Sequence, residues 1–137
     1  MAYTARLVDY FYTSLGAPSD EAYALLRDLA GLGVNFLALT SVPIGPSTTQ
    51  LTLFPEDPLR FQAAAKQANL TLQGPYPAVL VQGDDEIGAL AQIHERLRRQ
   101  NVDVYATSGV TDGKGYYGYI LHVRPRDAER AVRALEG

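Results

Sequence analysis

The chain contains no cysteine among its 137 residues. This absence excludes disulfide bonds, thiolate metal sites and cysteine nucleophiles. The sequence also lacks an apolar run of transmembrane length and a charged-then-apolar signal segment, so we expect a soluble, cytoplasmic protein. Excess basic charge is missing as well, because the net charge is −3. Nucleic-acid binding needs a basic surface, and we therefore expect neither a nucleic-acid nor a membrane partner.

Basic residues are nevertheless distributed unevenly. Residues 94–137 carry eight basic and six acidic side chains, against four and nine in residues 1–93. Most of the later arginines fall in predicted helices, which is more typical of a solvated surface than of a binding groove.

Motifs for catalysis or metal binding are also absent. The two histidines, His94 and His122, have no partners at zinc-ligand spacing, and His94 fits a core or half-buried position. The glycine-rich stretch 111–118 lacks the ending of a phosphate-binding loop and is better explained as a hairpin with an Asp-Gly turn. No nucleophile, base and orienting group can be assembled, so we predict a protein without catalytic residues, metal or cofactor.

The most regular pattern lies in residues 78–107. A short apolar run at 78–81 precedes an acidic turn that contains Gly88. A helical pattern follows, in which Leu90, Ile93, His94 and Leu97 share one face. Residues 102–107 then predict a strand, so the unit is strand, turn, helix and strand.

The first half of the chain repeats this order. A shift of 68 residues places Leu25 on Ile93 and Val34 on Val102, and a shift of 70 places Asp57 on Asp127. Matched apolar positions, turns and helix caps indicate a duplicated unit. We predict an α+β fold of two tandem ferredoxin-like βαββαβ modules, each an antiparallel sheet with helices on one face.

The predicted boundaries are residues 9–74 and 75–137. The second copy ends directly after its second helix and lacks a last strand. The 68-residue shift maps the last strand of the first copy, predicted at 70–73 before a Gly74-Pro75 break, onto residues 2–5. We therefore predict that residues 2–8 supply the last strand of the second module.

The turn and strand motifs resemble the ACT domain family, whose small βαββαβ modules bind amino acids and regulate metabolic enzymes. Asp85-x-x-Gly88 followed by Asn101-Val102-Asp103-Val104 carries the resemblance, although Ile87 stands where the family usually has proline. In the first copy, Asp20 takes the place of Gly88. The resemblance covers the whole chain and implies a regulatory protein that senses an amino acid.

The turn before the second-half helix is the predicted ligand site, comprising Asp85, Glu86, Ile87, Gly88 and Ala89. Free N–H groups at the helix start would bind a carboxylate, and Asp85 would bind an ammonium group. The alternative is that Asp84, Asp85 and Glu86 only cap the helix and complement its dipole.

Two strand-start residues, Asn35 and Asp103, are the predicted completion of the site, because this position contacts ligand in the resembled family. The alternative is local turn bonding by Asn and Asp. The competing function for the whole chain is a protein-interaction module that holds no ligand.

Apolar residues on the predicted outer sheet faces indicate a partner, because a solvated face should be more polar. We predict a homodimer that buries this face or extends the sheet across two chains. The residues concerned are Leu37, Leu39, Phe54, Tyr105 and Ile120.

Overall fold

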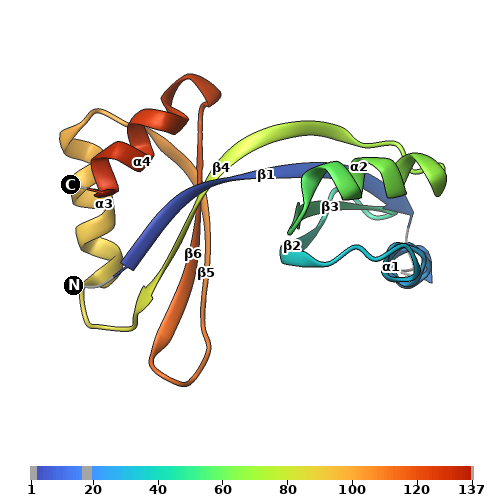
Figure 1. The fold of residues 1–137 in the computed structure, drawn as a ribbon, viewed down its shortest axis with the longest axis horizontal. Helices are drawn as coiled ribbons and strands as arrows, with labels where there is room; N and C mark the ends of the chain where they lie inside the picture. The colour runs from blue at the N-terminus through green and yellow to red at the C-terminus, as the bar shows by residue number, and fades with distance from the viewer. Residues whose placement is uncertain (1–2, 17–19, 137) are drawn as a thin grey trace. The chain divides into compact units, whose positions relative to one another are not determined.

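The computed structural model describes residues 3–16 and 20–136. The described chain is α+β, with six strands in one antiparallel-paired sheet and four α-helices (Figure 1). The first half contains β1 (Tyr3–Gly16), α1 (Asp20–Gly31), β2 (Phe36–Pro43), β3 (Thr48–Pro55) and α2 (Pro58–Gln67). The second half contains β4 (Gln73–Asp84), α3 (Ala89–Arg99), β5 (Val104–Thr111), β6 (Tyr116–Val123), the short 3-10 turn η1 (Pro125–Asp127) and α4 (Ala128–Glu136). Ala2 and Ser19, which the sequence assigned to a strand and a helix cap, lie outside the described residues.

The chain divides into two compact units. One unit consists of residues 9–76, and the other joins residues 1–8 to residues 77–137. Strands β1 and β4 therefore each contribute residues to both units. The order of neighbouring strands is β2-β3-β1-β4-β6-β5.

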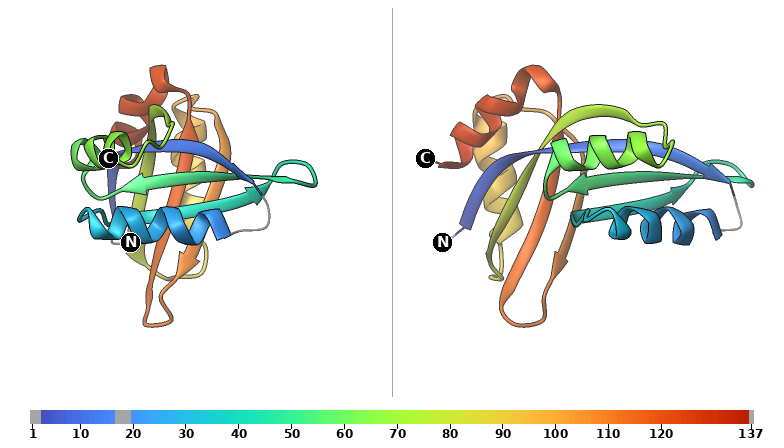
Figure 2. Two further views of the ribbon diagram at one scale, coloured as in Figure 1. Left: turned by 90° about the vertical axis from the view of Figure 1, so that its right-hand side faces the viewer. Right: turned by 45° about the vertical axis from the view of Figure 1, so that its right-hand side comes forward.

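The unit of residues 9–76 has the strand order β2-β3-β1-β4, with β3 antiparallel to both β1 and β2. Its helices α1 and α2 contact one another, and both are seen clearly in Figure 2. The buried core consists of Phe11, Leu29, Leu51, Leu53, Phe61 and Ala64. The periodic apolar residues of β3 and of the two helices thus form one core.

The unit of residues 1–8 and 77–137 has the corresponding order β5-β6-β4-β1. Helices α3 and α4 lie next to one another, and the core beneath them includes Val79, Ile93, Leu97, Leu121 and Leu135. The start of β1 is anchored here, because the Tyr3 hydroxyl donates to the Leu135 carbonyl over 2.5 Å and Arg96 Nη1 donates to the Tyr3 hydroxyl over 2.8 Å.

Both units carry a β-bulge at the same place in the repeat. The register shifts between Phe36 and Ala38 in β2, and between Val104 and Ala106 in β5. The extra residues are Leu37 and Tyr105, which are 68 positions apart. Because a one-residue insertion exchanges the two faces of a strand, every side chain beyond the bulge changes side.

The bulge corrects the predicted outer face. Leu39 pairs with Leu53, a core residue, so it lies on the helix-covered face and not on the opposite one. Phe54 and Ile120 are only 1% and 7% exposed within this single chain, so they are not part of an open face. Tyr105 remains 57% exposed. A simple two-residue alternation fails here because the sequence does not reveal the bulge.

Two further predictions about elements are wrong. Residues 70–72 form no strand, so the strand predicted at 70–73 is absent, and the Gly74-Pro75 break does not occur, because β4 runs unbroken from Gln73. Gly74 has a φ of +126°, and a Cβ there would lie 2.8 Å from the Tyr10 carbonyl oxygen, so glycine lets the neighbouring strand approach closely.

Candidate functional site

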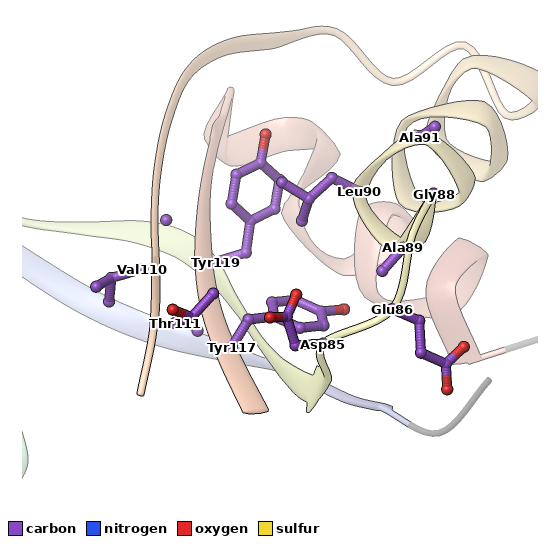
Figure 3. A pocket seen from close by; sticks show the side chains of 12 residues that line it. Asp85, Glu86, Gly88, Ala89, Leu90, Ala91, Val110, Thr111, Tyr117 and Tyr119 are labelled. Carbon is purple, nitrogen blue, oxygen red and sulfur yellow. The ribbon is translucent and has the colours of Figure 1, made fainter. Parts of the chain in front are cut away.

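An open cleft of about 610 Å³ lies beside the start of α3, in the unit of residues 1–8 and 77–137. We call it the α3 cleft. One wall is the turn and first helical residues, and the other is formed by the ends of β5 and β6 next to their hairpin. Figure 3 shows its lining, with Val110 and Glu86 at opposite ends of the view. The lining residues are Asp85, Glu86, Gly88, Ala89, Leu90, Ala91, Gly109, Val110, Thr111, Tyr117, Gly118 and Tyr119.

The helix start in this cleft has no side-chain cap. Gly88 is the N-cap residue, with a left-handed φ of +86°, and no side chain accepts a hydrogen bond from the first turn. The Ala89 N–H donates to the Glu86 carbonyl, and the first bond of the regular helix runs from Gln92 N–H to the Gly88 carbonyl. The N–H groups of Leu90 and Ala91 are left for an external acceptor, as at any uncapped helix start. Side-chain capping, one part of the alternative reading of this turn, is therefore not found among the described residues, whereas the effect of the acids on the helix dipole stays a prediction.

Asp85 and Glu86 lie beside the N–H groups of Leu90 and Ala91 and do not cap them. The Asp85 N–H donates to the Gly115 carbonyl, which ties the turn to the β5–β6 hairpin. The side chains of Asp85 and Glu86 are exposed and line the cleft. The cleft is thus lined both by residues with free N–H donors, Leu90 and Ala91, and by the negatively charged Asp85 and Glu86.

Tyr119 forms a wall of the cleft because Gly109 faces it. The two residues are cross-strand partners, and a Cβ on Gly109 would lie 2.7 Å from Cδ1 of the tyrosine ring. At the other end of the ring, the Tyr119 hydroxyl and His94 Nε2 are 2.8 Å apart in a hydrogen bond. His94 is thus an exposed residue whose ring forms a partly buried hydrogen bond to β6, whereas the sequence predicted a core or half-buried position.

Tyr117 contributes a buried hydroxyl without a hydrogen-bond partner among the described residues. The residue is 7% exposed and belongs to the core under α3 and α4. Burial raises the pKa of Tyr117 above its usual value, and the nearby Tyr3, Asp84 and Glu86 add to the rise. The hydroxyl therefore stays protonated at neutral pH and can donate as well as accept a hydrogen bond.

The structure brings four of the predicted site residues together and separates three. Asp85, Glu86, Gly88 and Ala89 line the cleft, but Ile87 is fully exposed and does not. Asp103 does not line it either; its carboxylate lies 3.9 Å from Arg124. Asn35 belongs to the other unit, where its amide donates to Glu56 over 3.3 Å.

Sequence reasoning missed the strand side of the cleft. Thr111 pairs with Tyr117 and Gly109 with Tyr119, which brings these residues opposite the helix start. The predicted Asp-Gly hairpin is confirmed, since Asp112 Oδ1 accepts from the N–H of Lys114 over 2.6 Å. Counting outward from that turn gives the pairing and is the signal that could have found these residues.

Among the described residues, no group of three or more His, Cys, Asp or Glu is arranged to hold a metal ion. Within the same part of the chain, no helix is both long and apolar enough to cross a membrane.

Several solved structures have a fold similar to that of this chain. A protein of Bacteroides thetaiotaomicron superposes with a TM-score of 0.81 at 17% identity, over 96% of this chain and 88% of the other. The regulatory subunit of aspartate kinase from Thermus thermophilus, in its ligand-free form, gives 0.61 at 15% identity, over 96% and 94%. The regulatory subunit from Thermus flavus gives 0.60 at 12% identity, over 99% and 95%.

No protein-family model matches the sequence, and no curated protein shows significant similarity to it. The likeness at these identities concerns the fold alone. The fold of this chain is similar to that of the aspartate kinase regulatory subunits.

Proposed function

We propose that this protein is a non-catalytic regulatory protein that binds an amino acid in the α3 cleft. The observation that carries the proposal is the uncapped start of α3, whose Leu90 and Ala91 N–H groups line the cleft beside the carboxylates of Asp85 and Glu86. A carboxylate would accept from the helix start, where the dipole also favours negative charge. An ammonium group would pair with Asp85 or Glu86. The named aspartate kinase regulatory subunits share the fold and so support a regulatory role.

The size and lining of the cleft support an amino acid as the ligand. Its volume of about 610 Å³ lies within the usual range of small-molecule sites. Leu90, Val110 and Tyr119 add apolar surface for a ligand side chain. A phosphate at the same helix start would be repelled by the two adjacent carboxylates.

Calorimetric titration with each of the common amino acids tests the proposal. We expect heat of binding for one amino acid or a small chemically related group, with a melting temperature that rises with ligand concentration. If no amino acid gives heat or raises the melting temperature, the proposal is wrong.

Ala91 is the best position for a variant that blocks the site. It is exposed, lines the cleft and lies in the first turn of α3, where an acidic side chain complements the helix dipole. Ala91→Asp should keep or slightly raise stability while its carboxylate occupies the place of the ligand carboxylate, weakening binding about tenfold or more. Ala91→Gln is the uncharged control and should bind more tightly than the aspartate variant. Gly88 is a poorer probe, because its φ of +86° would strain any other residue.

Asp85→Asn tests the other end of the ligand. The change keeps the shape of the side chain and removes its charge, so we expect weaker binding of an amino acid and little change for its deaminated acid. Asp28→Asn, an exposed position on α1 in the other unit, is the matched control and should leave binding unchanged. Equal losses from both variants would contradict a specific role for Asp85.

We further propose that the two units are tandem ACT-like modules, at residues 9–74 and 75–137, with residues 2–8 as the last strand of the second. The corresponding strand orders of the two units and the repeated bulge support this arrangement. Asn35, Asp103 and Ile87 remain proposed ligand contacts only if an adjoining module or a second chain brings them to a cleft.

A homodimer is part of the same proposal. The edge strands β2 and β5 each have one unpaired side among the described residues, and the bulge residue Tyr105 is 57% exposed on β5. Pairing of such edges would extend the sheet across two chains. Tyr105→Lys or Leu37→Lys should weaken association, whereas a monomer mass that does not change with concentration in ultracentrifugation would contradict the dimer.

The second candidate function is an interaction module without a ligand. It is favoured by β5, whose residues from Tyr105 to Thr111 are all exposed in this chain. A chain that dimerises through this strand but gives no heat with any amino acid would establish this second function. In both cases we propose a cytoplasmic protein with no nucleic-acid or membrane partner.

A further inference from the structure

Four arginines line a second cleft, of about 450 Å³, between α3 and α4. We call it the α3–α4 cleft. Arg96 and Arg99 come from α3, and Arg130 and Arg133 come from α4, with Gln100 and Ala134 completing the lining. Each pair is three residues apart, so its members lie one turn apart on the same side of a helix. The two helices lie side by side and contact one another (Figure 1). This contact brings the two pairs to one cleft.

Two of these guanidinium groups are held in place by the protein. Arg96 Nη1 donates to the Tyr3 hydroxyl over 2.8 Å and to the Leu135 carbonyl over 3.2 Å. Arg130 Nη2 donates to Asp127 Oδ1 over 2.8 Å and to the Asn101 carbonyl over 3.3 Å. A guanidinium group has five N–H donors, so each retains donors for another acceptor. Arg130 Nε is one of these: it is shielded from solvent and has no acceptor among the described residues.

The other two arginines form only weak ion pairs. Arg99 pairs with Glu95 at 2.7 Å, with side chains 66% and 51% exposed. Arg133 lies 4.0 Å from Glu129, with side chains 67% and 82% exposed. Exposed pairs of this kind contribute little to stability, so both arginines can turn to a ligand at small cost.

Neither the fold nor the helix dipole requires this cluster. In the repeat, the positions of Arg96 and Arg99 correspond to Asp28 and Gly31 of the other unit. The positions of Arg130 and Arg133 correspond to Arg60 and Ala63. The matching face of the other unit therefore has one arginine and one aspartate in place of four arginines. The dipole favours Arg96, Arg99 and Arg133, which lie in the last turns of their helices, but it disfavours Arg130 in the first turn of α4.

We propose that the α3–α4 cleft binds a small molecule carrying two or more phosphate groups. Arginine binds phosphate and carboxylate oxygens with two parallel hydrogen bonds, and a terminal phosphate adds a third acceptor oxygen and more negative charge, which suits a cluster of four arginines. The cleft is large enough for more than a single phosphate, and its size is in the range of small-molecule sites. The site lies on the helix side of the unit and uses no residue of the α3 cleft.

Titration of the whole chain with inorganic tripolyphosphate in 0.15 M salt, on the order of physiological ionic strength, is the direct test. We expect saturable binding of one equivalent, together with a shifted Arg130 Nε–H resonance. Citrate serves as the carboxylate probe and should bind about tenfold more weakly or worse, since it carries less negative charge and only two acceptor oxygens on each carboxylate. Equal binding of citrate would overturn the assignment to phosphate.

A pair of double variants separates a specific site from general attraction. Arg99→Gln with Arg133→Gln removes two exposed lining charges, and we expect binding about a hundredfold weaker, or tenfold for each charged contact. Arg98→Gln with Arg126→Gln removes two exposed charges outside the lining and should change binding less than about threefold. Equal losses from the two double variants, or no binding in 0.15 M salt, would overturn the proposal.

Discussion

The two units have matching strand orders and matching bulges, yet they carry different side chains at equivalent positions of the repeat. Ser41 of one unit corresponds to Gly109 of the other, Phe54 to His122, and Asp57 to Asp127. Gly109 lines the α3 cleft and Asp127 accepts from Arg130 of the α3–α4 cleft, whereas Ser41 lines neither cleft and Asp57 caps α2. The comparison indicates that the repeat specifies the architecture, and that the two units differ in the polar residues they place on it.

Deletion of residues 1–8 should have the largest effect on the difference between the two units. Deleting them removes Tyr3 and its contacts with Leu135 and Arg96, and it also removes the buried Val8. We expect the unit of residues 77–137 to lose roughly 3 kcal/mol or more, from the lost burial of several apolar side chains. Hydrogen exchange should show faster exchange in β4 near Val79, whereas Leu51 and Leu53 in the other unit keep their protection. Unchanged protection at Val79 and Val81 would contradict the role of the first strand.

Gly109→Ser introduces the residue that the other unit has at this position. Because a Cβ at Gly109 would lie 2.7 Å from the Tyr119 ring, the ring must move and its hydrogen bond to His94 should be lost. We expect a loss of about 1–3 kcal/mol in the free energy of unfolding, measured by urea denaturation. The control is Gly118→Ala, where a Cβ would meet nothing within 4 Å. Equal stability of the two variants would show that the Gly109–Tyr119 contact does not constrain the strand.

The matched aspartates Asp57 and Asp127 should respond differently to removal of charge. Asp57 caps α2 by accepting from the Arg60 N–H over 3.2 Å, and asparagine caps equally well. Asp127 is 9% exposed and accepts instead from the guanidinium of Arg130. We expect Asp57→Asn to change stability by less than about 0.5 kcal/mol, and Asp127→Asn to cost about 1–2 kcal/mol, because Arg130 loses its charged partner. Similar values for both in thermal unfolding would contradict this distinction.

His122 gives the smallest expected effect, a dependence of stability on pH. Burial lowers the pKa of His122 below its ordinary value of 6.5. As the pH falls below that value, the unfolded chain takes up a proton before the folded one does, so stability declines until the folded-state pKa is reached. His122→Phe, which copies Phe54 of the other unit, should reduce this decline between about pH 6.5 and pH 5 in urea titrations. A variant with an unchanged pH dependence would show that other groups cause it.

The sequence predicted elements far better than it predicted faces. The apolar periodicity located the described helices and strands, since burial of a face leaves a direct trace in the residue pattern. The bulges at Leu37 and Tyr105 left no such trace, because any side chain fits an exposed extra residue. This single irregularity moved Leu39 from the predicted open face to the covered one.

The sequence predicted the turn side of the candidate site but not its strand side. Asp85 and Gly88 stood out because a glycine and acidic residues before a helical pattern have clear physical roles. Tyr119 and Gly109 meet only through strand pairing, which is long-range information that local periodicity does not contain. The sequence did not reveal the α3–α4 cleft for a similar reason. Arg96 and Arg133 lie far apart in sequence, and only the contact of α3 with α4 brings them together.

The division of β1 between two units has a consequence for the order in which the chain can fold during synthesis. Residues 9–76 are continuous, so this unit can close as soon as its own residues have left the ribosome. Residues 1–8 are made first, but their strand neighbours and anchors lie in residues 77–137. Residues 1–8 therefore stay unpaired in the nascent chain until their partners in residues 77–137 have been translated. We expect chaperones to bind this unpaired segment during that time.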